Sequence, residues 1–134
     1  MKEILSESVG IILWNTTLQK YLLLQRRDSS LWEFPKGHIE DGELHEDTMK
    51  REVFEETGIE DCTVLKFVDF ITFQLIKEEE EVIKNRKIYY YTGETIDTNV
   101  VISDEHNQFK WLDEKEVLSL LKFNNMKELF LNSI

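Results

Sequence analysis

Three glutamates follow an arginine in the segment Arg51-Glu52-Val53-Phe54-Glu55-Glu56, and carboxylates at this spacing are suited to holding a metal ion. Residues three and four apart share one face of a helix, so a helix here brings Glu52, Glu55 and Glu56 together at one edge. Carboxylates that close repel one another unless positive charge lies between them. Arg51 offers part of that charge by pairing with Glu43 or a neighbouring glutamate. Mg²⁺ or Mn²⁺, which prefer oxygen ligands, would offer more.

A solvated acidic helix face, supported by Lys50 and Arg51, is the competing interpretation of this pattern. Two features argue against it. Met49 and Val53 are apolar on the adjacent face, so the helix is expected to be half buried. Gly37 and Gly42 bracket a segment, predicted to be a loop, whose backbone would approach the same edge. The residues therefore favour a buried cation site over a solvated surface.

The elements that must position these residues follow from hydrophobic periodicity. Helix is expected over 44–57, where Gly58 stands at the position of a C-cap glycine. Short β-branched and aromatic runs predict strands before and after this helix, and apolar residues at helical spacing predict two helices near the C-terminus. This order of elements predicts an α+β fold with helices packed on a mixed sheet. The expected strands are 9–14, 21–24, 31–34, 62–76 (as one strand or two), 87–92 and 109–112, and the late helices are 114–121 and 125–131.

The composition predicts a single domain spanning residues 1–134. The lone Cys62 excludes an internal disulfide and favours a reducing, cytoplasmic compartment, and no segment resembles a signal peptide or a membrane span. The net charge of −11 disfavours nucleic acid and anionic membranes as partners. A small phosphorylated substrate remains compatible with it if divalent cations lie between substrate and protein.

The spacing Gly37-x5-Glu43-x7-Arg51-Glu52-Val53-x-Glu55-Glu56-x-Gly58-Ile59 resembles the Nudix box at every defined position. The resemblance implies an α/β/α sandwich around a mixed sheet, with the box forming a loop-helix-loop metal site. It further implies that Glu52 and Glu56 are the principal metal ligands and that the Gly37 carbonyl joins them. Glu55 would be a ligand or the base, and Arg51 and Glu43 would be the pair that orients the carboxylates.

Metal-assisted hydrolysis is the chemistry that such a site supports. The cations neutralise phosphate charge and lower the pKa of a bound water. A glutamate then takes the proton as the water attacks phosphorus in line with the leaving phosphate. Which of the coupled glutamates acts as the base stays open at this stage.

Segments outside the box resemble the asymmetric diadenosine tetraphosphate hydrolases. Trp32-Glu33-Phe34-Pro35-Lys36-Gly37-His38 is similar to their W-x-x-P-K-G-H segment, and Glu105-His106 with Phe109-Lys110-Trp111-Leu112 is similar to their C-terminal region. The resemblance implies a phosphate contact for Lys36, a metal-ligand or base role for Glu105, and adenine stacking for Phe123. Packing between the late helices is the alternative for Phe123, and shaping of the loop is the alternative to a phosphate contact for His38. Lys84 and Lys87 are alternative candidates for a phosphate-contacting lysine. Tyr89 is a further substrate-contact candidate, and Phe73 is the candidate for a second aromatic wall.

The leading hypothesis is therefore a Mg²⁺- or Mn²⁺-dependent hydrolase that releases ATP and AMP from diadenosine tetraphosphate, acting as a monomer or homodimer. A MutT-like nucleoside triphosphate pyrophosphohydrolase or an RNA 5′-pyrophosphohydrolase is the alternative within the same chemistry. An inactive nucleotide sensor is the alternative from another class, although such a domain would usually have lost box glutamates that this chain retains.

Overall fold

Seven strands form one mixed sheet in the computed structural model, which describes all residues 1–134. The order along the sheet is β3-β2-β1-β6-β5, while β4 pairs with β1 and β7 pairs with β2. Strands β1 and β6 run parallel along their whole length, and every other pair is antiparallel. The strands are β1 (Lys2–Asn15), β2 (Lys20–Arg26), β3 (Trp32–Glu33), β4 (Lys36–His38), β5 (Thr63–Lys77), β6 (Val82–Thr95) and β7 (His106–Leu112).

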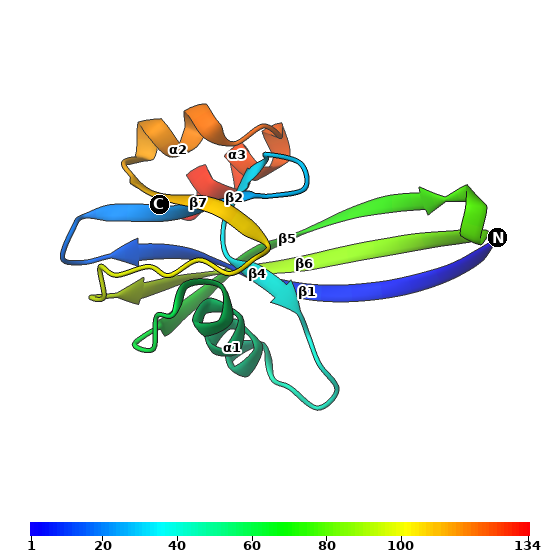
Figure 1. Cartoon of the computed structure of the whole chain (residues 1–134), viewed down its shortest axis with the longest axis horizontal. Coiled ribbons are helices and arrows are strands. Elements are labelled where there is room, and N and C mark those ends of the chain that lie inside the picture. The colour runs from blue at the N-terminus through cyan, green and yellow to red at the C-terminus, as the bar shows by residue number, and fades with distance from the viewer.

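Helices cover both faces of this sheet, because the central strand β1 is apolar on both sides. Its residues Val9, Ile11 and Leu13 pack against the face covered by helix α1 (His45–Thr57), and Ile12 lies in the core on the opposite face. Helices α2 (Glu114–Leu120) and α3 (Asn124–Asn132) cover that second face (Figure 1). The predicted sandwich of helices around a mixed sheet is confirmed. None of the three helices is long and apolar enough to cross a membrane.

Several element boundaries differ from the sequence-based predictions. Strand β1 begins at Lys2 rather than at residue 9, and β6 begins at Val82 rather than at residue 87. Segment 62–76 forms one strand and not two, with the 3-10 turn Glu78–Glu80 joining it to β6. The outer parts of β1 and β5 are mostly exposed on both faces, and the outer part of β6 is half-buried throughout. None of them shows the alternating pattern by which strands are recognised in a sequence.

The loop predicted from Gly37 to Gly42 is wrong at its start. Lys36–His38 is the strand β4, in which Gly37 pairs with Val9 and His38 pairs with Ser8. Three residues with a central glycine carry no strand signal of their own, and only pairing with β1 makes them a strand. This pairing holds the glycine rigidly beneath helix α1.

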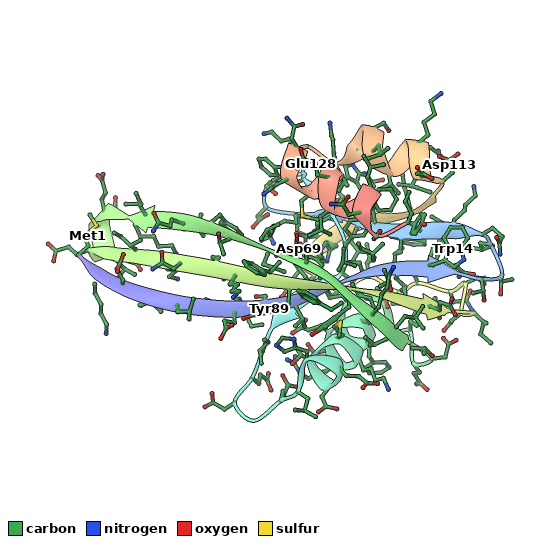
Figure 2. All side chains as sticks on the ribbon, turned by 180° about the vertical axis from the view of Figure 1, so that it is seen from behind. Met1, Trp14, Asp69, Tyr89, Asp113 and Glu128 are labelled. Atoms are coloured by element: carbon green, nitrogen blue, oxygen red, sulfur yellow. The ribbon has the colours of Figure 1, made fainter.

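The outer parts of three strands extend beyond the helices as an arm. We define the arm as residues 2–7 of β1, 71–77 of β5 and 82–87 of β6, which pair with one another in that part of the sheet. Figure 1 shows these strands reaching away from all three helices to the N-terminus, and Figure 2 shows Met1 at their tip. Ile71, at the inner end of the arm, packs against the core cluster under α2 and α3, and beyond it no helix covers the arm.

Candidate metal centre

Helix α1 directs its glutamates to different surroundings. The helix ends at Gly58, whose φ of 75° is left-handed and whose N–H bonds the Phe54 carbonyl. Met49 and Val53 anchor its apolar face in the core, and this orientation buries Glu56, which is 3% exposed. Glu55 points toward solvent, with its side chain 55% exposed. The glutamates that share one edge of the helix therefore differ sharply in burial.

Arg51 ties the helix to the preceding loop. Its Nε and Nη2 each donate to a different oxygen of Glu43 at 2.8 Å, which is a bidentate ion pair. Its Nη1 donates to Glu52 Oε1 at 2.8 Å, and its Nη2 also donates to the His38 carbonyl at 2.9 Å. The Arg51 hydrogen bond holds the pKa of Glu43 down at about 2. The predicted Glu43–Arg51 pair is present, and Arg51 also fixes Glu52.

Gly37 lies directly under the carboxylate of Glu52. A Cβ atom added to Gly37 would lie 1.9 Å from Glu52 Cδ, closer than any side chain permits. Only glycine lets this carboxylate rest on strand β4. The requirement for glycine here is therefore close approach, and not an unusual backbone conformation.

Glu56 is the most deeply buried carboxylate of the chain. The backbone N–H of Lys36 donates to its Oε1 at 3.0 Å. Burial raises the pKa of Glu56 to about 9, and the nearby carboxylates of Glu33, Glu52 and Glu105 add to the rise. Burial likewise raises the pKa of Glu52. Several carboxylates thus share a site with no cationic side chain between them and Glu56.

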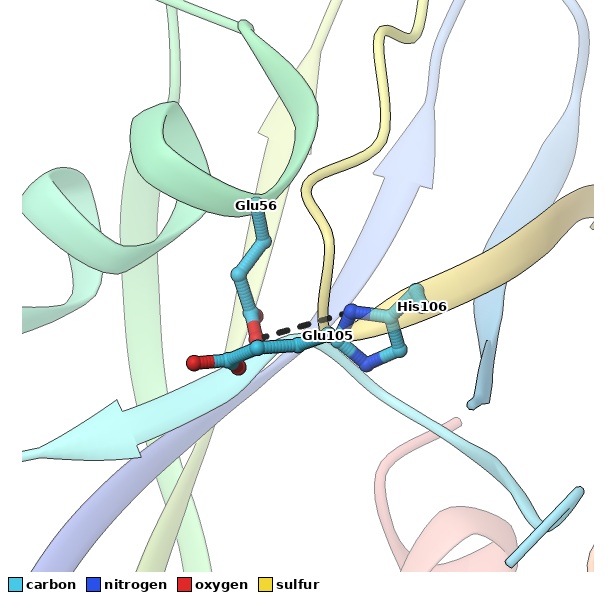
Figure 3. A group of neighbouring side chains, drawn as sticks. All are labelled: Glu56, Glu105 and His106. Carbon is cyan, nitrogen blue, oxygen red and sulfur yellow. Dashed lines mark ion pairs between the residues drawn. The ribbon is translucent and has the colours of Figure 1, made fainter. Parts of the chain in front are cut away.

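His106 completes a cluster with Glu56 and Glu105 (Figure 3). One ligand atom from each of the three lies within 4.8 Å of the others. The His106 ring is 1% exposed, with Nε2 at 2.9 Å from Glu33 Oε2 and Nδ1 at 3.9 Å from Glu56 Oε2. Nδ1 is buried and has no hydrogen-bond partner.

The donor set fits a hard divalent cation. Its oxygens come from Glu52, Glu56 and Glu105, which are the ligands that Mg²⁺ and Mn²⁺ prefer. A buried carboxylate and an unpartnered buried ring nitrogen are both costly, and a cation between them would offset both costs. The glycine cradle under Glu52 shows that the backbone is shaped to admit a carboxylate at this point.

His38 is neutral where the structure places it. Its Nε2 lies 3.3 Å from Arg86 Nη1, and its Nδ1 lies 3.2 Å from the hydroxyl oxygens of Ser6 and Ser8. An arginine can only donate, so Nε2 accepts and the proton sits on Nδ1. Burial and then the charge of Arg86 lower the pKa of His38. Both nitrogens are engaged by the protein, which favours the loop-shaping alternative for this residue.

The remaining predicted substrate contacts lie at different places. The Lys36 ammonium is 3.6 Å from Glu33 Oε1, beside the metal centre. Lys87 lies over the rings of Phe70 and Tyr89, and the Tyr89 ring packs against His45 at the start of α1. Neither Lys87 nor Tyr89 is among the residues of the cluster. Phe123 precedes helix α3 and is 53% exposed, so it does not pack between the late helices.

Glu33 and His106 belong to the site although no role was predicted for either from the sequence. Both occur inside the segments that carry the subfamily resemblance, and that is the only signal that could have singled them out. Their contact depends on strands β3 and β7 pairing with the same strand, β2. No spacing within either segment reveals this.

Known proteins are similar to this chain in sequence and in fold. The model of the NUDIX domain matches residues 5–132. The chain belongs to the Nudix hydrolase family. Gly37 to Ile59 is accordingly its Nudix box, which contains Glu43, Glu52, Glu55 and Glu56, whereas Glu33 and Glu105 lie outside it.

Two curated proteins with similar sequences are named for different reactions. The asymmetrical bis(5′-nucleosyl)-tetraphosphatase of Mus musculus is 36% identical over 116 residues, which are 84% of this chain and 76% of that protein. The mRNA-decapping enzyme subunit 2 of Saccharomyces cerevisiae is 30% identical over 93% of this chain but only 12% of its own length. Among solved structures, the MutT protein from Methanosarcina mazei Go1 superposes with a TM-score of 0.81 at 22% identity, covering 98% of this chain and 94% of that one.

Proposed function

We propose that this Nudix hydrolase cleaves a phosphoanhydride bond of a dinucleoside polyphosphate and releases ATP and AMP from diadenosine tetraphosphate. The observation that carries the reaction class is the convergence of Glu56, Glu105 and His106, with the carboxylate of Glu52 close enough to raise the pKa of Glu56. The similarity to the mouse tetraphosphatase over most of both chains supports the dinucleotide substrate. We further propose that residues 1–134 form one catalytic domain, acting as a monomer or homodimer.

Glu52, Glu56 and Glu105, with the Gly37 carbonyl and Glu55, would hold Mg²⁺ or Mn²⁺. The cation supplies charge neutralisation for the phosphates and a lower pKa for a bound water. Neighbouring residues of the chain hold the side chains of this site in position. Arg51 holds Glu52 and Glu55, the Lys36 N–H holds Glu56, and Glu33 orients the His106 ring. The Lys36 ammonium lies beside this centre, where it would contact substrate phosphate.

Glu105 is proposed as the proton acceptor, with Glu55 as the alternative. Glu105 is exposed, so its carboxylate has access to water, yet it lies within the cluster. As water adds to phosphorus, its proton passes to the carboxylate while the bond to the leaving phosphate oxygen breaks. The leaving group departs as the terminal phosphate of one of the two products, ATP or AMP. Atoms and charge balance without any other reactant.

A substrate panel tests this proposal. Diadenosine tetraphosphate, nucleoside triphosphates and 5′-triphosphorylated RNA are compared with Mg²⁺ and with Mn²⁺, using the wild type and Glu56→Gln, Glu105→Gln and Glu55→Gln. Loss of about a thousandfold is expected for Glu56→Gln and Glu105→Gln, and a smaller loss for Glu55→Gln. Glu60→Gln, an exposed glutamate outside the cluster, is the matched control.

Three results would contradict parts of the proposal. Turnover of triphosphates without turnover of dinucleoside polyphosphates would transfer the assignment to the MutT-like class. A larger loss in Glu55→Gln than in Glu105→Gln would move the proton acceptor to Glu55. Absence of hydrolysis throughout the panel, with nucleotide binding retained, would identify a sensor.

A further inference from the structure

Strand β5 forms one border of the sheet, because it pairs with β6 and with no other strand. Figure 1 shows it along the outer side of the arm, with no strand beyond it. A strand at such a border directs backbone N–H and C=O groups away from the sheet, and these groups can pair with a strand of another chain. Proteins usually prevent such pairing with bulges, prolines or charged side chains along the strand.

The two halves of β5 differ in this protection. The pairing of β5 with β6 is irregular at two places between Val64 and Asp69. From Asp69 to Lys77 the pairing is regular, the strand has no proline, and charged residues stand only at its two ends. We call residues 69–77 the free edge. The free edge is therefore long, regular and open to pairing.

Large apolar side chains of the free edge are exposed on both faces of the sheet. Successive residues of a strand alternate between the faces, so Phe73 and Leu75 lie on one face and Phe70 and Ile76 on the other. Each of the four is between 40% and 61% exposed. Exposed apolar groups along an unpaired strand indicate a surface that another strand covers.

The sequence of the free edge is complementary to itself in the antiparallel direction. A two-fold axis perpendicular to the sheet at Phe73 places each residue opposite the one equally far from Phe73 on the other side. Opposite residues then match in kind: Asp69 with Lys77, Phe70 with Ile76, Ile71 with Leu75, Thr72 with Gln74, and Phe73 with itself. Moving the axis by one residue would place Lys77 opposite Phe67 or Ile71. The match therefore selects one register.

The charges at the two ends of the free edge lack partners in their own chain. Neither Asp69 nor Lys77 takes part in an ion pair. The Asp69 carboxylate accepts a hydrogen bond from the N–H of Phe70 at 2.7 Å, and Lys77 lies close enough to Lys84 to lower the pKa of Lys84. Across the axis, Asp69 would lie opposite Lys77 of the second copy at both ends of the ladder. Opposite charges directly across a strand pair stabilise it.

We infer that two copies of this chain associate along the free edge, antiparallel and centred on Phe73, so that one sheet continues through both copies. Each copy has one free edge, so this association closes at a dimer and does not extend into a filament. It pairs the outward backbone groups of β5 and covers apolar side chains of the arm. The inference narrows the proposed monomer or homodimer to a homodimer, and it rests on none of the hydrolytic chemistry.

Exchanging the charges at the ends of the free edge tests the pairing. Asp69→Lys would place lysines opposite one another, and Lys77→Asp would place aspartates opposite one another. Each variant alone should dimerise about tenfold more weakly than the wild type, because both end pairs change from attraction to repulsion. An equal mixture of the two variants should dimerise like the wild type, since every lysine then lies opposite an aspartate. Sedimentation equilibrium over a concentration series measures these dissociation constants.

Lys115→Asp is the matched control for charge reversal. Lys115 is exposed on α2, away from the free edge, so this variant should dimerise like the wild type.

A cysteine at the axis tests the register. Phe73→Cys places two thiols opposite one another, where Cα atoms of antiparallel neighbours lie about 4.5 to 5.5 Å apart and a disulfide can form. Leu75→Cys is the matched control, because its two copies lie four residues apart along the ladder, or about 13 Å, which is out of reach. Non-reducing electrophoresis after mild oxidation should show a linked dimer for Phe73→Cys alone. The native Cys62 is buried and can stay in both variants.

Several outcomes would overturn the inference. A wild type that stays monomeric across the series, or a mixture of charge variants that does not recover dimerisation, would do so. A linked dimer for Leu75→Cys and none for Phe73→Cys would place the copies in another register. Glu56→Gln is expected to lose hydrolysis and to dimerise like the wild type, so failure of one proposal leaves the other measurable. Thermal unfolding of each variant confirms that it is folded.

Discussion

Gly37 shows how one missing side chain shapes the metal centre. Gly37→Ala places a methyl group 1.9 Å from Glu52 Cδ, and strand β4 cannot retreat because it is paired with β1. We expect Glu52 to be displaced and kcat to fall about a hundredfold, because a shift of about 1 Å at a catalytic site has effects of this size. The measurement is hydrolysis as a function of Mg²⁺ concentration.

Gly42→Asn is the matched control for that substitution. Gly42 has a φ of 82° with nothing within 4 Å of an added Cβ, and asparagine tolerates this conformation. Its activity should stay near that of the wild type. Wild-type Mg²⁺ dependence in Gly37→Ala would show that the position of Glu52 is not set by Gly37.

Glu56 is expected to destabilise the metal-free protein. Its carboxylate is buried among other carboxylates, and its only hydrogen bond comes from the Lys36 N–H, which a glutamine oxygen can also accept. Glu56→Gln should therefore raise the free energy of unfolding without Mg²⁺ by about 1 to 3 kcal/mol. Added Mg²⁺ should stabilise the wild type and no longer stabilise the variant.

Urea unfolding with and without Mg²⁺ measures both effects. Glu60→Gln, exposed and outside the cluster, should behave like the wild type in each condition. Full Mg²⁺ stabilisation of Glu56→Gln would be incompatible with Glu56 as a metal ligand.

At the scale of elements, Asp61 connects the start of β5 to the end of β6. It accepts hydrogen bonds from the Thr95 hydroxyl at 2.5 Å and the Ile96 N–H at 2.9 Å. Burial raises the pKa of Asp61, but these hydrogen bonds outweigh it and the pKa is lowered overall. A lowered carboxyl pKa contributes stability above its unfolded value, near 3.8, and that contribution is lost as the pH falls through the folded value.

Asp61→Asn should therefore cost about 1 kcal/mol of unfolding free energy at pH 7, because Asp61 is exposed and its bonds are partly screened. The difference from the wild type should shrink below pH 4, where the aspartate also loses its charge. Urea unfolding of the wild type and the variant at pH 7 and at a pH below 4 measures this difference in unfolding free energy. A deficit of equal size at both would show that charge plays no part.

At the scale of the whole molecule, the arm and the sandwich should differ in local stability. The two parts share the strand β1, whose residues 9–13 are buried and whose residues 2–5 are exposed. Local opening of the arm would expose little additional apolar surface, so it costs less free energy than opening of the sandwich. Hydrogen exchange should therefore be faster for the Ile4 and Leu5 amides than for Ile11 and Ile12, although all four lie in one paired strand.

Exchange rates measured at several protein concentrations check this expectation. Uniform protection along β1 at every concentration would contradict it. Protection of the arm that rises with concentration would show a second copy covering it.

The effect of the net charge of −11 on binding can also be judged only at the scale of the whole molecule. Averaged over the chain, it predicts repulsion of nucleic acid. The alternation of residues in the three paired strands of the arm, however, places Lys2, Lys77, Lys84 and Arg86 on one face and Glu3, Glu7 and Lys87 on the other. Composition does not record on which face of a strand a charge lies, so surface chemistry cannot be predicted from the sum.

The sequence by itself determined the local part of this protein. Helix α1 and its glycine cap follow from spacings of a few residues, because helix geometry sets which of its side chains share a face. The ion pair of Arg51 with Glu43 was also expected, although Glu43 lies in the loop before the helix. The alternation of a strand likewise places Tyr90 in the core on one face of β6 and Tyr89 and Tyr91 on the other.

Only the tertiary structure decided what depends on distant segments. Glu33 and His106 meet because β3 and β7 both pair with β2, and Glu56 is buried while Glu55 is exposed because α1 packs against β4 on one side only. The arm likewise exists through strand pairing and not through an apolar pattern of its own. Burial and long-range contact are properties of how elements pack, and packing is set by the whole set of side chains rather than by the spacing within any one segment.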